Sequence, residues 1–345
     1  MIRGLQSIGI KRSALLAILR KSIVILNKSR SKLYSYSVET FQETQISDAR
    51  TWPSRKSIPI AILVQGPVPE DVNFLTKILN HYKFVNKKTQ IFVSTWKDER
   101  AQNFAEIFKD ETNIKFVLND LPTNPGPSNI NLQIASTRGG LNSILSEGYT
   151  YVVKTRTDQC MFNPRAVENL LALYEHHNKG SGNKIVVNAL NTFLFRLYGA
   201  SDMLQFGNIE DLVKYWDAPQ DPRTAVEESI LKSAPTLRNY AKHNVGETYL
   251  GIHYLRSLGL QPNFSLKQSL DNISHNFIVA DNDVTNTLWH KYSRQINRWP
   301  SRGELIPFQQ IDYSTWLALN SGKLSFNEYE YLLDQEISNG FFKAV

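Results

Sequence analysis

The chain has 345 residues, 41% of them hydrophobic and 21% charged, which is typical of a globular protein with ample material for a core. Its single cysteine, Cys160, excludes an internal disulfide framework and a cysteine-rich zinc site, and favours a reducing compartment. The net charge of +7 lies at one end: residues 1–38 contain eight Lys or Arg and no acid, whereas the remainder holds 31 basic and 32 acidic residues. A nearly neutral body gives no reason to expect nucleic acid as a partner.

Residues 1–38 form a basic, partly amphipathic arm. Arg20 and Lys21 interrupt its apolar run, so no stretch approaches the roughly 20 apolar residues that a spanning helix needs. Such a segment with a Ser-rich tail favours peripheral contact with an anionic membrane surface. An organellar transit peptide and a plain disordered extension are the alternatives. The polar residues 39–57 are expected to be a linker.

From Ile58 onward, short β runs alternate with helical periods. Strands are expected at 60–64, 90–93, 114–118, 151–153, 184–187 and 192–197. Helices are expected at 71–82, 101–108 and 164–177, with a further one after the Pro- and Gly-rich loop 122–129. This alternation indicates βαβ units and therefore an α/β fold with a mostly parallel sheet.

After about residue 208 the pattern becomes mainly helical. Helices are expected at 209–216, 224–233 and 248–258, with one more short strand at 278–279. A terminal helix is predicted to begin at the capping box Ser325-x-x-Glu328. We therefore expect a domain over residues 58–300 and a helical C-terminal extension over 301–345.

The run from Tyr151 to Gln159 is the most informative stretch of the chain. An apolar strand ends there in two cations and a carboxylate, Lys154, Arg156 and Asp158. In an open α/β sheet, ligands bind outside the carboxyl ends of the strands. The pattern predicts a site for a phosphorylated or metal-bound ligand, and a surface salt-bridge cluster is the plain alternative.

Other strand ends carry polar residues that would lie at the same edge of the sheet. Gln65-Gly66-Pro67 lets the backbone approach a ligand closely, although a simple tight turn has the same sequence. Ser94-Thr95-Trp96 offers two hydroxyls and a ring that could stack on a base or sugar, or serve as a core lid. Asn129, Asn131 and Gln133 stand at a loop-to-helix junction, where they could hold a nucleotide or cap the helix.

Several familiar catalytic motifs do not occur in the chain. It has no G-x-G-x-x-G after its first strand and no G-x-x-x-x-G-K-[ST], so a dinucleotide fingerprint and a P-loop are excluded. It also has neither H-E-x-x-H nor G-x-S-x-G. The strand-end residues remain as the candidates for chemistry.

Together, the motifs Val-Gln-Gly-Pro, Ser-Thr-Trp, Asn-x-Gln and Lys-Thr-Arg-Thr-Asp-Gln resemble the WavE family of lipopolysaccharide-synthesis proteins. The resemblance covers about residues 58–295 and extends to Tyr198-Gly199-Ala200-Ser201-Asp202, Gly246-Glu247-Thr248 and Asn276–Val279. It implies a GT-A-like fold, in which residues 58–300 form a catalytic domain that transfers a sugar from a nucleotide-sugar donor.

The resemblance also implies roles for single residues. Asp158 is similar to the acidic residue with which GT-A enzymes bind Mg²⁺ or Mn²⁺ on the donor diphosphate. Arg156 occupies the place of the first carboxylate of the usual D-x-D motif, so Arg156 and Lys154 are alternative means of neutralising the diphosphate. Glu247 and Asp202 are the candidates for the base that an inverting transfer needs. Helix-start electrostatics and helix capping are their plain alternatives.

We therefore expect a glycosyltransferase, hexosyl or related, on the cytoplasmic, inner face of a membrane. Its acceptor would be a lipid-linked glycan of a lipopolysaccharide core or a capsule-like polymer, and the arm at residues 1–38 would keep the enzyme near it. A non-catalytic assembly protein that binds glycan or nucleotide is one alternative, because fold does not fix function. A nucleotide-sugar hydrolase is the other.

Overall fold

The computed structural model describes residues 58–85, 89–179, 183–224, 236–244, 246–290 and 309–336. The predicted arm, the predicted linker and all but the first residue of the helix predicted at 224–233 lie outside the described residues.

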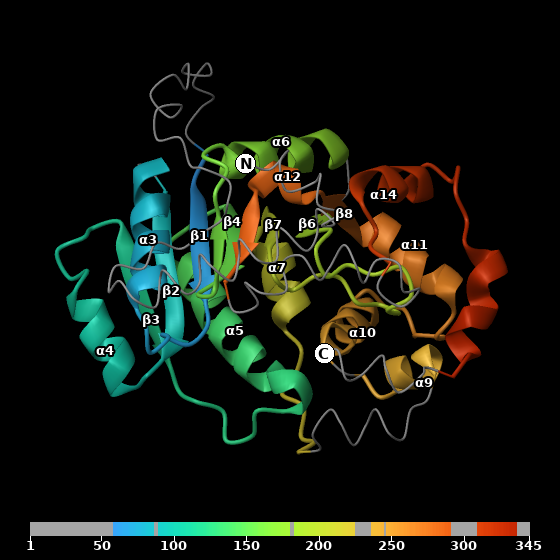
Figure 1. Cartoon of the computed structure of the whole chain (residues 1–345), viewed down its shortest axis with the longest axis horizontal. Coiled ribbons are helices and arrows are strands. Elements are labelled where there is room, and N and C mark those ends of the chain that lie inside the picture. Colours follow the sequence, from blue (N-terminus) through green and yellow to red (C-terminus); the bar gives the residue numbers. More distant parts are fainter. Residues whose placement is uncertain are drawn as a thin grey trace, which may run out of the picture. The chain divides into compact units, whose positions relative to one another are not determined.

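In the described part of the chain, seven strands form the main sheet, in the order β3-β2-β1-β4-β7-β6-β8 (Figure 1). Neighbouring strands among β1 to β4 are parallel, as are β6 and β8, whereas β7 is antiparallel to both of its neighbours. The predicted α/β class with a mostly parallel sheet is confirmed. The strands are β1 (Ile60–Gln65), β2 (Gln90–Trp96), β3 (Ile114–Asn119), β4 (Tyr151–Arg156), β6 (Ile185–Asn188), β7 (Gln205–Asn208) and β8 (Phe277–Ala280).

A second, two-stranded sheet continues from the end of β4. It pairs β5 (Gln159–Met161) with β9 (Thr287–Trp289) in antiparallel fashion. Its register sets Gln159 opposite Trp289, so a segment that is distant in sequence lies beside Asp158.

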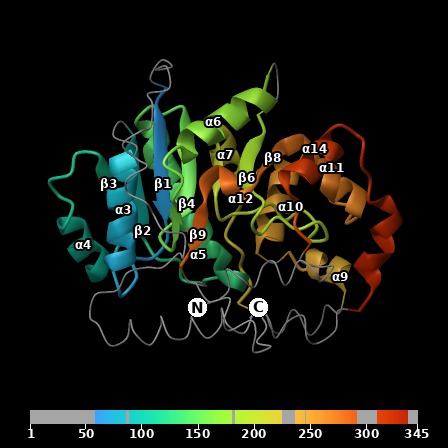
Figure 2. The same cartoon turned by 45° about the horizontal axis from the view of Figure 1, so that its top comes forward.

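Helices flank the sheet, and α11 and α14 lie beyond β8 in both views, whereas α12 packs on α6 (Figures 1 and 2). Among them α11 and α14 pack on each other and on β8, and the Trp316 indole donates a 2.8 Å hydrogen bond to the carbonyl of Phe277. The helices are α3 (Asn73–Val85), α4 (Glu99–Glu106), α5 (Ile130–Ser146), α6 (Ala166–His177), α7 (Ile209–Trp216), α9 (Leu237–Lys242), α10 (Glu247–Ser257), α11 (Leu266–Asn276), α12 (Asn282–Thr285) and α14 (Tyr313–Asn320), with the 3₁₀ segments η2 (Pro127–Asn129) and η4 (Asn327–Asp334).

Helix α5 packs closely on β1, β2 and β3 because it presents glycine to them. A Cβ atom at Gly140 would lie 2.3 Å from Cδ1 of Leu63 and 2.9 Å from Cβ of Ser94. The close approach brings the first turns of α5 to the carboxyl ends of the strands, where the predicted site lies.

The prediction of a strand at 192–197 is wrong. Asn191 and Tyr198 at the two ends of that run have φ values of 72° and 61°, so the backbone turns at both ends. Of the described residues in this run, only Phe193 takes part in a β bridge, with Gln310. The run is apolar because it is a buried loop. The unpredicted strand β7 follows it and is stabilised by pairing on both sides, although Gly207 and Asn208 are poor strand formers.

The terminal helix predicted from Ser325 is a 3₁₀ helix, η4, rather than an α-helix. Its Glu330 carboxylate accepts hydrogen bonds from Arg238, at 2.9 Å, and from the backbone nitrogen of Leu266, at 2.7 Å. These long-range contacts fix the segment against α9 and α11. Helices α11 and α14, which the sequence pattern did not predict, complete the C-terminal part.

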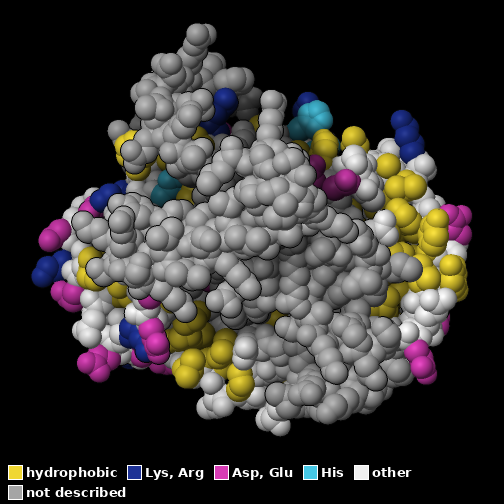
Figure 3. All heavy atoms as spheres, viewed as in Figure 1, with side chains coloured by type: hydrophobic (Ala, Val, Ile, Leu, Met, Phe, Trp, Pro, Cys, Tyr) yellow, Lys and Arg dark blue, Asp and Glu magenta, His cyan; other side chains and the backbone are white. Residues whose placement is uncertain are grey.

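Hydrophobic side chains show at the right-hand edge of the molecule in Figure 3, where the C-terminal elements lie in Figure 1. The large exposed ones of these elements are Leu317, Leu324, Tyr329 and Tyr331. Within the described ranges, no helix has the length and apolar character to cross a bilayer.

Replacing Gly251 by Ala should destabilise the protein, although alanine is the better helix former. A Cβ atom there would lie 1.8 Å from the carbonyl oxygen of Tyr198, so α10 would have to move away from the loop before β7. We expect a loss of about 1–3 kcal/mol in the free energy of unfolding, measured in urea. Arg256→Ala, at an exposed position of the same helix, is the control, and equal stability of the two variants would contradict the packing argument.

Candidate functional site

Lys154 lies fully buried at the carboxyl end of β4. Its ammonium donates a hydrogen bond to the main-chain carbonyl of Asp202 and lies 4.7 Å from the ring centroid of Trp216. Burial lowers the pKa of Lys154 to about 8, against an opposing effect of the Asp202 charge. The residue therefore places a cation beneath the sheet edge without itself reaching solvent.

Arg156 and Asp158 form a bidentate ion pair just beyond Lys154. Arg156 Nε lies 2.9 Å from Asp158 Oδ1, and Arg156 Nη2 lies 3.0 Å from Oδ2. The indole nitrogen of Trp289, on β9, donates a further hydrogen bond of 3.1 Å to Oδ2. The pair of sheets thus holds the Asp158 carboxylate from two directions.

Glu247 begins α10 and is held by two residues of the loop before β7. Asn191 donates from its side-chain amide to Glu247 Oε1, and Arg196 Nη1 lies 2.9 Å from Oε2. Arg196 Nη1 also donates to Asn191 Oδ1 at 3.1 Å, so the three side chains close a ring. The guanidinium of Arg196 lies 4.6 Å from the ring centroid of Phe193.

Asp202 lies in the same loop, 3% exposed. Burial and the nearby charge of Glu247 raise the pKa of its carboxyl group, against the opposing effects of Lys154, Arg156 and Arg196. Electrostatic interactions thus connect the end of β4 with the loop and with α10. We name these six residues the charged cluster: Lys154, Arg156, Asp158, Arg196, Asp202 and Glu247.

The charged cluster balances three cations with three acids, and part of it reaches solvent. The side chains of Arg156, Asp158, Arg196 and Glu247 are each about one fifth exposed, at 19%, 22%, 21% and 20%. A ligand from solution can therefore reach these four side chains. Lys154 is fully buried, whereas Asp202 retains an exposed fraction of 3%. A cavity of about 690 Å³ lies elsewhere, beside α4, and no member of the charged cluster lines it.

Gln65 and Ser94, at the ends of β1 and β2, are bound to Ser136 of α5. Gln65 Nε2 donates to Ser136 Oγ at 2.8 Å, and Ser94 Oγ donates to Ser136 O at 2.5 Å. Because Ser136 Oγ donates to the carbonyl of Leu132, it must accept from Gln65. The remaining oxygen of the Gln65 amide is a buried acceptor without a hydrogen-bond partner among the described residues. Gln65 is also the register partner of Arg156.

The other residues at these two strand ends differ in exposure. Trp96 is buried, and so is Thr95, whose hydroxyl has no hydrogen-bond partner in the described part of the chain. Gly66, at φ 135°, leaves room for Thr157, because a Cβ atom there would lie 2.6 Å from Thr157 Oγ1. Pro67 is exposed.

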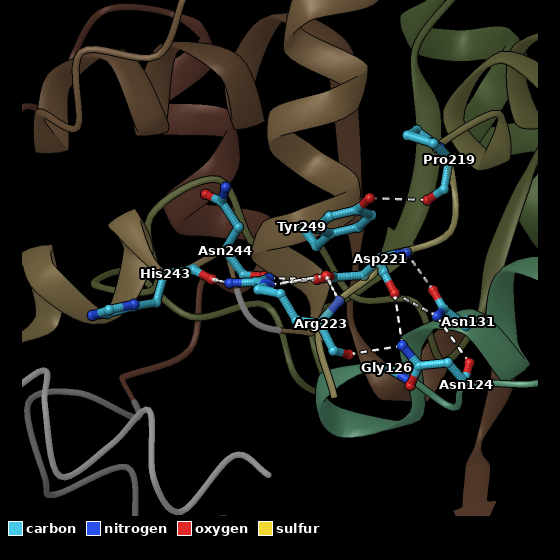
Figure 4. Close-up of polar contacts among 9 residues, drawn as sticks. All are labelled: Asn124, Gly126, Asn131, Pro219, Asp221, Arg223, His243, Asn244 and Tyr249. Carbon is cyan, nitrogen blue, oxygen red and sulfur yellow. Dashed lines mark hydrogen bonds and ion pairs between the residues drawn. The ribbon is translucent and has the colours of Figure 1, made fainter. Parts of the chain in front are cut away.

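Asn131 belongs to a polar network that joins the segment before α5 to the segment before α10 (Figure 4). Its amide nitrogen donates a 2.8 Å hydrogen bond to the carbonyl of Asp221, and its amide oxygen accepts a 2.6 Å hydrogen bond from the backbone nitrogen of the same residue. The Asp221 carboxylate in turn binds Arg223, whose guanidinium donates to the carbonyls of His243 and Asn244. Asn129, directly before α5, has a left-handed backbone conformation and makes no side-chain hydrogen bond that caps the helix.

The structure thus brings together all five of the charged residues that the sequence indicated. Ser94 and Asn131 are engaged in structural hydrogen bonds, and Gln133 is half-buried with an unpartnered amide oxygen among the described atoms. Their binding roles, like those of Gln65, Gly66, Pro67, Thr95 and Trp96, stay predictions.

Sequence reasoning missed Arg196 and Asn191. Arg196 interrupts the apolar run from Phe193 to Tyr198, and a cation inside a buried run needs a partner of opposite charge. That signal predicts a paired arginine but not its partner, because Glu247 lies about 50 residues further along the chain.

The donor set at Asp158 does not fit a resident Mg²⁺ or Mn²⁺. Such ions prefer several oxygen ligands, whereas both Asp158 oxygens already accept hydrogen bonds from Arg156 or Trp289. Over the described ranges, no three His, Cys, Asp or Glu side chains come close enough to hold a metal ion. The role of Asp158 as a metal ligand stays a prediction that these contacts do not support.

The WavE lipopolysaccharide synthesis family model matches residues 60–289. The chain belongs to this family. The expected α/β architecture, with a mostly parallel sheet, flanking helices and a helical C-terminal part, is confirmed. No curated protein matches the chain at a significant level.

Solved structures match this WavE-family chain only weakly. A cytidylyltransferase from Leptospira borgpetersenii is 11% identical, with a TM-score of 0.38 over 83% of this chain and 100% of that one. Residues 1–349 of S. aureus TarS are 10% identical, with a TM-score of 0.33 over 77% of this chain and 91% of that one. A putative nucleotide-diphospho-sugar transferase from Desulfovibrio desulfuricans is 11% identical, with a TM-score of 0.32 over 52% of this chain and 75% of that one. These similarities are too weak to bear on substrate or mechanism.

The burial of Lys154 predicts a distinctive pH dependence of stability. Its pKa is about 8 in the folded chain against an ordinary 10.5, so the unfolded chain binds more protons between these values and stability rises with pH there. Relative to Lys154→Met, the wild type should gain up to about 3 kcal/mol from pH 8 to 10.5, measured by urea unfolding. Lys267→Met, on an exposed surface of α11, is the control. Parallel curves for wild type and Lys154→Met would contradict the burial of a titrating ammonium.

Replacing Arg223 by Met should destabilise the link between the segments before α5 and α10. The change leaves the Asp221 side chain, which is 2% exposed, without its cation, and removes donors from two carbonyls. Because Arg223 is itself one third exposed, we expect the free energy of unfolding, measured in urea, to fall by about 2–3 kcal/mol. The double variant Asp221→Asn, Arg223→Met should be less destabilised than Arg223→Met alone, and the reverse order would contradict the ion-pair account.

Proposed function

We propose that this WavE-family protein is a glycosyltransferase that moves a sugar from a nucleotide-sugar donor to a glycan acceptor in lipopolysaccharide or capsule synthesis. The observation that carries the proposal is the charged cluster at the sheet edge, where three cations meet three acids. Ligands of open α/β sheets bind at that edge. A donor diphosphate is an anion that such cations can recognise.

In this proposal Arg156 binds the diphosphate of the donor. Its guanidinium is planar and held in place by Asp158, so it can exchange part of that pairing for phosphate oxygens. Lys154 lies behind it and adds positive potential without contact, because it is buried. The polar strand-end residues Gln65, Ser94, Thr95, Asn131 and Gln133, with Gly66, Pro67 and Trp96, would surround the nucleotide and sugar.

The chemical step needs stabilisation of the departing diphosphate and a base for the acceptor hydroxyl. Fixed cations at the leaving group supply the first, since a preorganised site need not reorient during the reaction. Asp202 and Glu247 are the candidates for the second, and both belong to the charged cluster.

The acceptor and the location belong to the same proposal. A lipid-linked glycan would lie at the inner, cytoplasmic face of the membrane, and residues 1–38 carry the basic and apolar residues for peripheral contact there. Membrane attachment would raise the local concentration of enzyme at its acceptor.

An assay with a panel of nucleotide sugars tests the proposal, following release of nucleoside diphosphate with and without acceptor glycan. Arg156→Met should raise the KM for the donor by about 10- to 150-fold, equivalent to 1.5–3 kcal/mol of charged hydrogen bonding. Arg138→Met, an exposed arginine paired with Asp217, is the matched control and should leave the KM unchanged.

The alternatives give different results in the same assay. Release at the full rate without acceptor would indicate a nucleotide-sugar hydrolase. A non-catalytic assembly protein would give no release with any donor, and its Asp158→Asn variant would still complement a knockout, whereas a transferase variant should lose turnover while keeping its fold.

A further inference from the structure

The two carboxylates at the proposed acceptor side differ in what holds them. Both oxygens of Glu247 are already engaged, one by the amide of Asn191 and the other by Arg196 at 2.9 Å. Since Arg196 also binds Asn191, the ring of three side chains is closed. Both oxygens of the Glu247 carboxylate are thus used to hold the ring together.

This ring joins the start of α10 to the loop before β7. Asn191 and Arg196 lie in that loop, which also carries Asp202. Asn191 has the strained φ of 72°, and α10 presses against the loop at Gly251, directly over the carbonyl of Tyr198. The contacts of Glu247 therefore fix the place of the segment in which Asp202 stands.

The carboxylate of Asp202, unlike that of Glu247, is not held by hydrogen-bond donors within the described part of the chain. No side chain of the described residues donates a hydrogen bond to its carboxylate, although its main-chain carbonyl accepts one from Lys154. Burial and the charge of Glu247 raise the pKa of the carboxyl group, which brings it nearer to the pH at which a base works best. The charged and titratable groups that face it from β4, α7, α10 and its own loop are Lys154, Arg156, Tyr215, Glu247 and Arg196.

We infer that Asp202 is the base that accepts the proton of the acceptor hydroxyl, and that Glu247 is a positioning residue that acts through Asn191 and Arg196. The inference rests on the proposed glycosyl transfer. In that step the acceptor oxygen bonds to the anomeric carbon of the donor sugar. The bond from that carbon to the diphosphate breaks, its electron pair leaves with the nucleoside diphosphate, and the hydroxyl proton passes to Asp202.

Steady-state kinetics of Asp202→Asn and Glu247→Gln from pH 5 to 9 test this assignment. Asp202→Asn should lower kcat by about 10²- to 10⁴-fold with the donor KM within about threefold of wild type. Glu247→Gln should keep at least about a tenth of kcat, and the acid limb of its pH profile should move to lower pH. The limb moves because the variant lacks the negative charge that raises the pKa of Asp202.

Binding of a nucleoside diphosphate, measured by calorimetry, shows that each variant is folded, and Asp271→Asn on the surface of α11 is the control. Loss of kcat in Glu247→Gln with retention in Asp202→Asn would overturn the assignment, as would equal losses without a shift of the limb. A wild type that transfers no sugar from any donor would instead overturn the proposed function, and the assignment with it.

Discussion

The hydrogen bond from the buried ammonium of Lys154 to the carbonyl of Asp202 holds the two parts of the candidate site together. One part is the end of β4, which continues to Arg156 and Asp158, and the other is the loop that leads into β7. The antiparallel pairing of β7 with β4 sets Gln205 opposite Lys154, and Gln205 accepts a 2.7 Å hydrogen bond from the indole of Trp216, whose ring lies under the ammonium. A cation at a strand end thereby organises a loop that comes about 50 residues later.

A buried charge costs free energy unless it is paired, so the charged cluster is close to self-neutralising. Arg156 is paired with Asp158, Arg196 with Glu247, and Lys154 lies in the field of Asp202. Such pairing keeps the cations ordered before a ligand arrives, which is how a site stabilises developing negative charge at little cost of reorganisation. The carboxylate of Asp202, which has no hydrogen-bond donor among the described side chains, is the exception, and burial of an ionisable group without a donor is typical of functional sites.

Much of the sheet could be predicted from the sequence because its parallel strands are short apolar runs that end in polar residues. The charged residues at the end of β4 were recognisable for the same reason, since nothing in a buried strand requires Lys, Arg and Asp at its end. The loop from 189 to 204 was not predictable, because its apolar residues look like a strand and only φ values at Asn191 and Tyr198 exclude one. Arg196, Trp289 and the network around Asp221 depend on contacts between distant segments, which local patterns do not encode.

A crystal structure of the protein with a bound nucleotide sugar or nucleoside diphosphate tests whether Arg156 binds the donor diphosphate. We expect phosphate oxygens within about 3 Å of the Arg156 guanidinium, as in other charge-assisted hydrogen bonds, with Asp202 facing the sugar side. A diphosphate bound away from the carboxyl ends of β1 and β4, with the Arg156–Asp158 pair untouched, would contradict this expectation.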